Sequence, residues 1–123
     1  MIKKLYSNLI NSLNGLKIVF KENSFILELV LGFFLIPYIF LSNIDFNYKI
    51  ILSVLYFLLL AFEIMNTAIE KLCDKITTDL DPKIKNIKDL SSAAVFIVLL
   101  ILIVFFLITI WINWFVSYGR VNN

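Results

Sequence analysis

Four polar residues at helical spacing interrupt an apolar stretch near the middle of the chain. They are Glu63, Asn66, Glu70 and Asp74, within the segment FEIMNTAIEKLCD (62–74). At about 100° per residue, these positions of an α-helix fall within about 80° of one another. One face of the helix therefore carries two glutamates, an amide and an aspartate. The stripe covers about 16 Å along the helix axis, from the edge of the hydrocarbon towards water.

The deepest of these residues is a candidate for proton transfer. Glu63 directly follows thirteen residues without a charge (50–62). An acidic residue within a membrane span is costly unless it faces protein or a wet cavity, so a functional role is the first hypothesis. The chain contains no histidine, so an acid or base must be a carboxylate, lysine or hydroxyl. A simpler interpretation, with Glu70 and Asp74 as solvated charges balanced by the lysines that follow them, does not explain Glu63.

Two further glutamates, Glu22 and Glu28, flank the start of the first long apolar stretch. If both neighbouring apolar stretches cross a membrane, this boundary lies on the same side as Glu70, and Glu22 could meet it. Two carboxylates without histidine suit a hard divalent cation such as Mg²⁺, which keeps several waters and binds phosphate oxygens. Alternatively, Glu22 only balances the charge of Lys21.

A basic segment, TTDLDPKIKNIKDL (77–90), precedes the last apolar stretch. Lys83, Lys85 and Lys88 can hold an anion as point charges, and Asp89 lies just before the last apolar stretch. The positive-inside rule by itself predicts lysines in a cytoplasmic loop such as this one. These lysines therefore indicate phosphate binding only in combination with the carboxylates. The sequence has neither a GxxxxGK[ST] loop nor protein-kinase motifs, so a bound nucleotide would need another kind of site.

The composition indicates that these residues are positioned by membrane helices. Hydrophobic residues make up 61% of the 123 residues, whereas soluble domains are nearer half apolar. Residues 2–20 place apolar side chains on one face and lysines and polar residues elsewhere, which favours an interfacial helix over a cleaved signal peptide.

We expect an all-α membrane protein with residues 1–123 as one domain. Its expected elements are a surface helix (1–24), spans at 26–45, 48–72 and 91–115, and a cytoplasmic loop at 73–90.

The distribution of basic residues predicts the orientation. Nine lysines precede the first span or lie between the second and third, whereas Lys49 and Arg120 lie on the other side. The positive-inside rule then places the N-terminus and residues 71–90 in the cytoplasm and the C-terminus outside. We expect a multi-pass protein of the bacterial inner membrane.

The motif E-x-x-N-[ST]-A-I-E at 63–70, followed by Asp74 and by Lys88-Asp89 with Ser-Ala-Ala-Val at 92–95, resembles the bacterial integral-membrane diacylglycerol kinase family. The resemblance covers nearly the whole chain. It implies a homotrimer that transfers the γ-phosphate of MgATP to the primary hydroxyl of a membrane lipid, converting sn-1,2-diacylglycerol to phosphatidic acid. ATP, Mg²⁺, a lipid and further copies of the chain are the implied partners, and no nucleic acid is expected.

The resemblance also implies roles for individual residues. Glu63 matches the catalytic base, which contacts the lipid hydroxyl. Glu22 and Glu70 match metal-holding and nucleotide-contacting glutamates, and Lys88 with Asp89 matches a nucleotide-contacting pair. Further nucleotide contacts are implied for Lys4, Asn11, Asp74, Asp79 and Asp81, and further lipid contacts for Asn66, Ser92, Ser24, Phe25 and Glu28.

Two alternatives concern the acceptor and the class of protein. Related Gram-positive members phosphorylate undecaprenol, but Glu28, where those members tend to have histidine, favours diacylglycerol. Basic residues common in the family on the substrate side are replaced here by Ile26 and Asn14, which bears on the choice of lipid.

A non-enzymatic ion-conducting or transport bundle, with Glu63 as proton relay, predicts acidic residues across the whole bilayer. The first and third spans have none at mid-depth.

Overall fold

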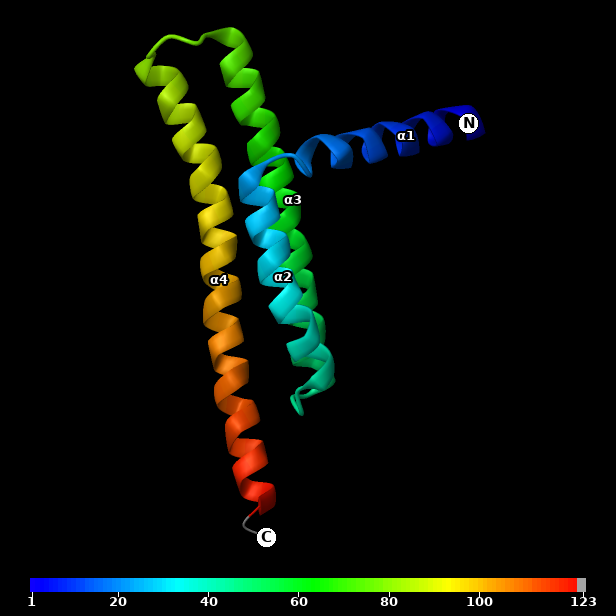
Figure 1. Ribbon diagram of the computed structural model, residues 1–123, viewed down its shortest axis with the longest axis vertical. Coiled ribbons are helices and arrows are strands. Elements are labelled where there is room, and N and C mark those ends of the chain that lie inside the picture. The colour runs from blue at the N-terminus through cyan, green and yellow to red at the C-terminus, as the bar shows by residue number, and fades with distance from the viewer. Residues whose placement is uncertain (122–123) are drawn as a thin grey trace.

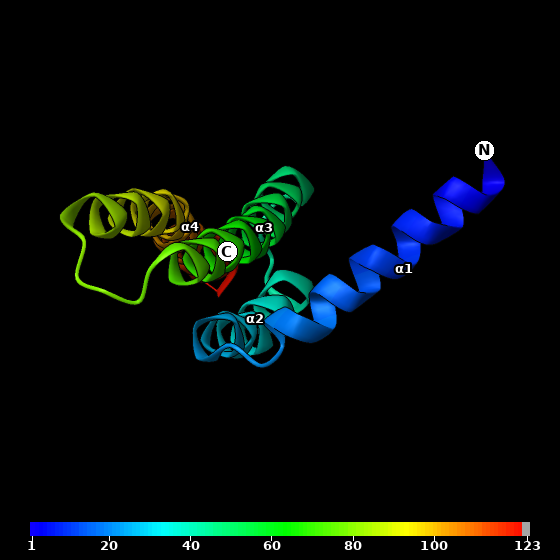
Figure 2. The ribbon, with the colours of Figure 1, turned by 90° about the horizontal axis from the view of Figure 1, so that it is seen from above.

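The computed structural model describes residues 1–121, which form four α-helices (Figure 1). They are α1 (Ile2–Val19), α2 (Asn23–Leu41), α3 (Phe46–Ile76) and α4 (Pro82–Val121). Helices α2, α3 and α4 run alongside one another as a bundle, and α1 projects away from it (Figures 1 and 2). The three bundle helices are each long and apolar enough to cross a membrane. The expectation of an all-α membrane protein with three spans is confirmed.

Helices α3 and α4 extend well beyond the apolar stretches that predicted them. With 31 and 40 residues they are about 47 and 60 Å long, against about 30 Å of hydrocarbon. Residues 73–76 and 82–90, expected in a loop, are helical, so the connection is only 77–81. Pro82 begins α4, and the Asp81 carboxylate accepts a hydrogen bond of 2.7 Å from the backbone N–H of Lys83. A proline at the first position and an aspartate before it are strong signals for a helix start.

The turn between α2 and α3 lies at the end of the bundle opposite the 77–81 connection (Figure 1). Asp45 caps α3 by accepting a hydrogen bond of 2.9 Å from the backbone N–H of Asn47. The Asn113 side chain of α4 accepts another of 2.9 Å from the backbone N–H of Asn43. The turn is therefore tied to α4 as well as to the two helices that it joins.

Helix α3 is the central element because it packs against both α2 and α4. One apolar cluster fills the space between the three helices. Its buried members are Leu35, Ile39, Ile44, Leu52, Tyr56, Leu59, Val98 and Leu102. Most other apolar side chains of the bundle point outward, as they do in a protein surrounded by lipid rather than by water.

Helix α1 presents its apolar side chains to its surroundings. Leu5, for example, is 73% exposed, and Leu9 and Leu13 on the same face are also exposed. The helix leaves the bundle near the start of α2 (Figure 1). This is the geometry that a helix lying in the membrane interface would need, with the apolar face against the acyl chains.

Gly32 on α2 and Tyr56 on α3 lie in close contact. The Tyr56 hydroxyl donates a hydrogen bond of 3.2 Å to the backbone carbonyl of Glu28. A β-carbon at position 32 would lie only 1.9 Å from the Tyr56 hydroxyl oxygen. The absence of a side chain at Gly32 therefore lets the buried Tyr56 ring cross to α2 and fix the helix that carries Glu28.

We predict that Gly32→Ala lowers the free energy of unfolding by about 1–3 kcal/mol, because the rigid Tyr56 ring must move and lose its hydrogen bond. Unfolding of the purified protein in mixed micelles, followed by circular dichroism, measures the change. Gly15→Ala is the matched control, since nothing lies within 4 Å of the β-carbon that it would add to α1. Equal stability of the two variants would contradict this account of the contact.

Candidate functional site

The polar stripe on α3 runs from the interior of the bundle to its surface, as its spacing predicted. Glu63 is 3% exposed and Asn66 is 7% exposed, whereas Glu70 and Asp74 are exposed. Because α3 is helical throughout this stretch, all four side chains lie along one face. The stripe therefore connects the apolar part of the bundle to its end at the 77–81 connection.

Three buried oxygens at the inner end of the stripe have no hydrogen-bond partner among the described residues. They are Glu63 Oε1 and Asn66 Oδ1 on α3 and Glu28 Oε2 on α2. The Glu28 and Glu63 carboxyl groups are close enough to interact electrostatically. A buried polar atom without a partner costs about 1–3 kcal/mol, so such a group is retained where a polar ligand binds. The sequence assigned both glutamates to the lipid side but did not indicate that α2 brings Glu28 within electrostatic reach of Glu63.

The middle of the stripe joins α3 to the start of α2. Asn66 Nδ2 donates a hydrogen bond of 3.2 Å to Glu70 Oε1, and Lys71 Nζ lies 2.6 Å from Glu22 Oε1. The charges of both Glu22 and Glu70 act on the Lys71 ammonium. Glu22 therefore comes to the same region as Glu70, as predicted, and its ion-pair partner is Lys71 rather than Lys21. Since this pair is largely exposed, it contributes little stability, and its importance is that it positions Glu22.

The outer end of the stripe joins α3 to α4. Lys88 forms an ion pair with Asp74, and the charge of Glu70 also acts on its ammonium. The simpler interpretation of the sequence paired Asp74 with a lysine beside it on α3. The structure instead recruits a lysine from the next helix, which brings a cation to the carboxylate stripe.

A polar pocket of about 520 Å³ lies between the ends of α3 and α4 and the residues that connect them. This volume is in the range of small-molecule and cofactor sites. Four of the residues predicted to contact nucleotide line it, namely Asp74, Asp79, Asp81 and Lys88. Lys85, Thr77 and Thr78 also line the pocket. The sequence indicated that Lys85 could hold an anion because of its charge. Nothing in the spacing of Thr77 and Thr78 indicated that they line a pocket.

Other residues predicted to function lie away from this pocket or are placed differently. Lys4 and Asn11 are on α1, which leads away from the bundle (Figure 1). Asp89 and Ser92 are exposed on α4, and Ser24 is exposed at the start of α2.

Phe25, predicted to contact lipid, is 3% exposed. Its ring packs edge-on against Phe20, with 5.5 Å between the ring centroids. In the described chain, this side chain holds the junction between α1 and α2.

The carboxylates fit the kind of site that Mg²⁺ uses with a phosphate ligand. Magnesium is commonly bound by one or two carboxylates together with substrate phosphates and water, rather than by a complete protein cage. Glu22 forms an ion pair with Lys71, and Glu70 directly precedes Lys71 on α3, so these two carboxylates would be the ones to hold the ion. No cluster of three or more acidic or cysteine side chains suited to a metal occurs in residues 1–119. The phosphate oxygens would therefore have to complete the coordination.

Fold and site together define an integral membrane protein with a polar, carboxylate-rich site at one end of a three-helix bundle. Residues 10–110 match the family model described as prokaryotic diacylglycerol kinase. The chain is 34% identical over 94 residues to a diacylglycerol kinase of Sinorhizobium sp., covering 76% of this chain and 68% of that relative. It is 33% identical over 94 residues to a diacylglycerol kinase of Pseudomonas aeruginosa, covering 76% of each chain. The chain therefore belongs to the prokaryotic diacylglycerol kinase family, a family of enzymes, and the resemblance noted in its motifs is confirmed.

We predict that Glu63→Met increases the free energy of unfolding by about 1–3 kcal/mol when no substrate is bound, because it removes a buried carboxyl oxygen without a partner. The thermal unfolding midpoint in detergent measures this change. Glu70→Met is the control, since Glu70 is exposed and bonded to Asn66, and it should give no gain. A lower midpoint for Glu63→Met would mean that this carboxyl group contributes to folding rather than to binding.

Proposed function

We propose that this protein transfers the γ-phosphate of ATP to the primary hydroxyl of diacylglycerol and forms phosphatidic acid. Family membership supports a kinase reaction, and the names of both relatives support this acceptor. The observation that carries the proposal is the continuity of the α3 stripe. One end holds buried oxygens without partners, and the other borders a pocket of suitable size for a nucleotide, lined by Lys85, Lys88 and three aspartates.

At the lipid end, Glu63 acts as the general base. The lipid hydroxyl oxygen attacks the γ-phosphorus, its proton passes to Glu63 Oε1, and the bond between the γ-phosphorus and the oxygen of the ADP leaving group breaks. Asn66 holds Glu70 through its amide nitrogen, and the single proton of the acceptor hydroxyl remains directed to Glu63. Glu28 lines the same buried region from α2, and Ser92, Ser24 and Phe25 remain predicted lipid contacts.

At the nucleotide end, Lys88 exchanges Asp74 for a phosphate oxygen. Asp79 and Asp81 border the far side of the pocket, where the adenosine would lie. Glu22 and Glu70 would hold Mg²⁺, which when bound with ATP neutralises charge on the phosphates. Asp89, Lys4 and Asn11 are proposed as additional nucleotide contacts on the basis of the resemblance.

The same proposal includes a trimer and an orientation. Glu70 and Asp74 are exposed in one copy, whereas phosphoryl transfer without loss to water requires an enclosed site. Neighbouring copies would provide that cover. The lysine distribution supports a cytoplasmic location for the N-terminus and the 77–81 connection, which is where ATP is available.

The proposal is tested by transfer from radiolabelled ATP in mixed micelles that contain diacylglycerol and undecaprenol together. We expect label in phosphatidic acid. Label only in undecaprenyl phosphate would retain the mechanism and replace the acceptor, and an intact protein that labels neither lipid would refute the proposed reaction.

We predict that Glu63→Gln lowers kcat for transfer about 10²–10⁴-fold, because the amide cannot take the hydroxyl proton. The initial rate of phosphatidic acid formation measures the loss. Asp45→Asn makes the same carboxyl-to-amide change at the opposite end of α3 and retains a side chain able to cap the helix. Its rate should be unchanged, and comparable losses in both variants would point to a general effect on the fold.

We predict that Lys88→Met raises the KM for ATP about tenfold or more, because a charge-assisted contact to phosphate is lost. The KM for diacylglycerol should stay the same. Lys75→Met removes an exposed lysine that does not line the pocket and serves as the control. A KM for ATP that is equal in the two variants would exclude Lys88 from nucleotide binding.

A further inference from the structure

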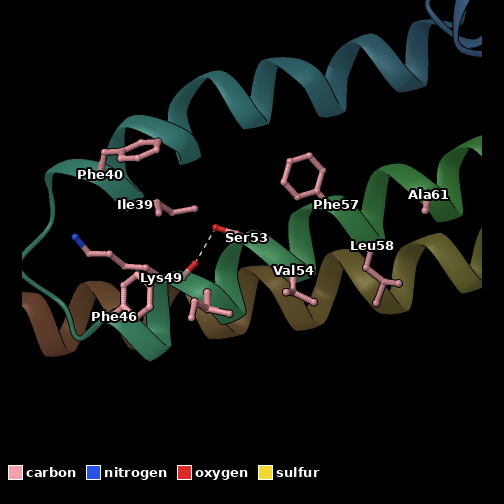
Figure 3. A pocket seen from close by; sticks show the side chains of 10 residues that line it. Ile39, Phe40, Phe46, Lys49, Ser53, Val54, Phe57, Leu58 and Ala61 are labelled. Atoms are coloured by element: carbon pink, nitrogen blue, oxygen red, sulfur yellow. Dashed lines mark hydrogen bonds between the residues drawn. The ribbon is translucent and has the colours of Figure 1, made fainter. Parts of the chain in front are cut away.

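Two ion pairs join a lysine to a carboxylate of the proposed kinase site. Lys71 on α3 pairs with Glu22 at the start of α2. Lys88 on α4 pairs with Asp74 on α3. At the opposite end of the bundle, Lys49 is the one charged residue that lines an apolar groove between α2 and α3 (Figure 3). It forms no ion pair with any side chain that the structure describes. Ion pairing is therefore concentrated at the site.

The pair of Glu22 with Lys71 occupies a carboxylate that the proposed function needs for Mg²⁺. Lys71 Nζ lies 2.6 Å from Glu22 Oε1, and the Glu22 carboxylate does not cap α2. A divalent ion on the same carboxylate would lie within about 5 Å of the ammonium, where two cations repel each other. The ammonium must therefore leave Glu22 before the ion can bind there.

Asp74 offers the Lys71 ammonium a second carboxylate on the same helix. The two residues are three positions apart, which makes them neighbours on the surface of α3. The charge of Asp74 acts on the ammonium, and both side chains are more than half exposed. Lys71 can therefore move between Glu22 and Asp74 by rotating its own side chain, without a shift of any helix.

We propose that Lys71 couples metal binding to nucleotide binding by exchanging Glu22 for Asp74. The inference rests on the proposed function, in which Lys88 leaves Asp74 for a phosphate oxygen. That step frees Asp74, which then accepts the Lys71 ammonium. Glu22 is released in turn and can hold the ion together with Glu70. Each carboxylate has a cationic partner before and after the exchange, so no charge is left uncompensated.

The exchange makes Lys71 a positioning residue with a measurable effect on metal affinity. Without nucleotide, the ammonium competes with a divalent ion for Glu22. Because an exposed ion pair contributes little free energy, this competition weakens ion binding by about fivefold. Nucleotide removes the competition, and by linkage the ion strengthens nucleotide binding to the same extent.

Titration of the full chain with Mn²⁺ in mixed micelles without nucleotide tests the competition. The electron paramagnetic resonance signal of free Mn²⁺ gives the affinity. We expect Lys71→Met to bind Mn²⁺ about fivefold more tightly than the unmodified chain, whereas Lys71→Arg retains the pair and shows no gain. Lys75→Met is the matched control, since it removes an exposed lysine one turn further along α3. No gain in Lys71→Met, or an equal gain in Lys75→Met, would overturn the proposal.

The same titration in a Glu22→Gln background identifies the carboxylate concerned. The gain from Lys71→Met should disappear there, because the ammonium no longer competes for a metal ligand. A gain of unchanged size would place the Mn²⁺ on other residues and would overturn the proposal.

A second cycle of variants tests the exchange itself. Lys88→Met frees Asp74 without nucleotide, so Lys71 can move to it, and we expect Mn²⁺ to bind about threefold more tightly. In a Lys71→Met background, Lys88→Met should add nothing. Equal gains in both backgrounds would mean that only the loss of a positive charge acts, and would overturn the exchange.

These titrations contain neither ATP nor a lipid acceptor, so they are independent of the transfer reaction. Formation of labelled phosphatidic acid together with an unchanged Mn²⁺ affinity in Lys71→Met would overturn the coupling and leave the kinase reaction in place. The expected Mn²⁺ affinities in a protein that labels no lipid would support the ion-pair exchange and refute the reaction alone.

Discussion

The carboxyl group of Glu63, held inside an apolar bundle, is the constraint on which the arrangement of the other helices depends. Hydrocarbon provides no hydrogen-bond partner, so a buried acid must face protein groups or a ligand. Helix α2 contributes Glu28, which also has a buried oxygen without a partner among the described residues, and α3 places Asn66 one turn further along the same face as Glu63. The site thus occupies the part of the bundle where polar groups can be enclosed, rather than the surface that lipid covers.

The bundle divides into a polar half and a closely packed half. Leu52, Leu59 and Leu102 are fully buried in the apolar cluster on the side of the α2–α3 turn. Tyr56, a member of this cluster, contacts Gly32 and donates its hydrogen bond to the backbone of Glu28. Packing in one half therefore sets the spacing between α2 and α3 in the other half, where side-chain positions matter for chemistry.

Long helices carry the polar residues out of the hydrocarbon without a flexible segment. Lys88 is within α4 rather than in a loop, and Asp74 is within the last turns of α3. Their ion pair joins two rigid elements just before the short 77–81 connection. In the proposed reaction this matters because a lipid and a nucleotide differ in solubility, and the protein must align them across the membrane boundary. A rigid stripe of about 16 Å provides such an alignment.

The sequence alone determined the features that depend on one helix at a time. The four polar residues of the α3 stripe share a face because helical periodicity relates 63, 66, 70 and 74 whatever surrounds them. The three spans followed from the length of their apolar stretches, and the family followed from the motif at 63–70.

Only the tertiary structure decided which residues of different helices meet. The ion pairs Glu22–Lys71 and Asp74–Lys88 depend on the rotation and depth at which neighbouring helices pack. The periodicity of a single helix contains no information about either quantity. Phe25 shows the same limit, because its burial and its edge-on contact with Phe20 depend on how the chain turns between α1 and α2. The spacing of residues within one helix does not determine that turn.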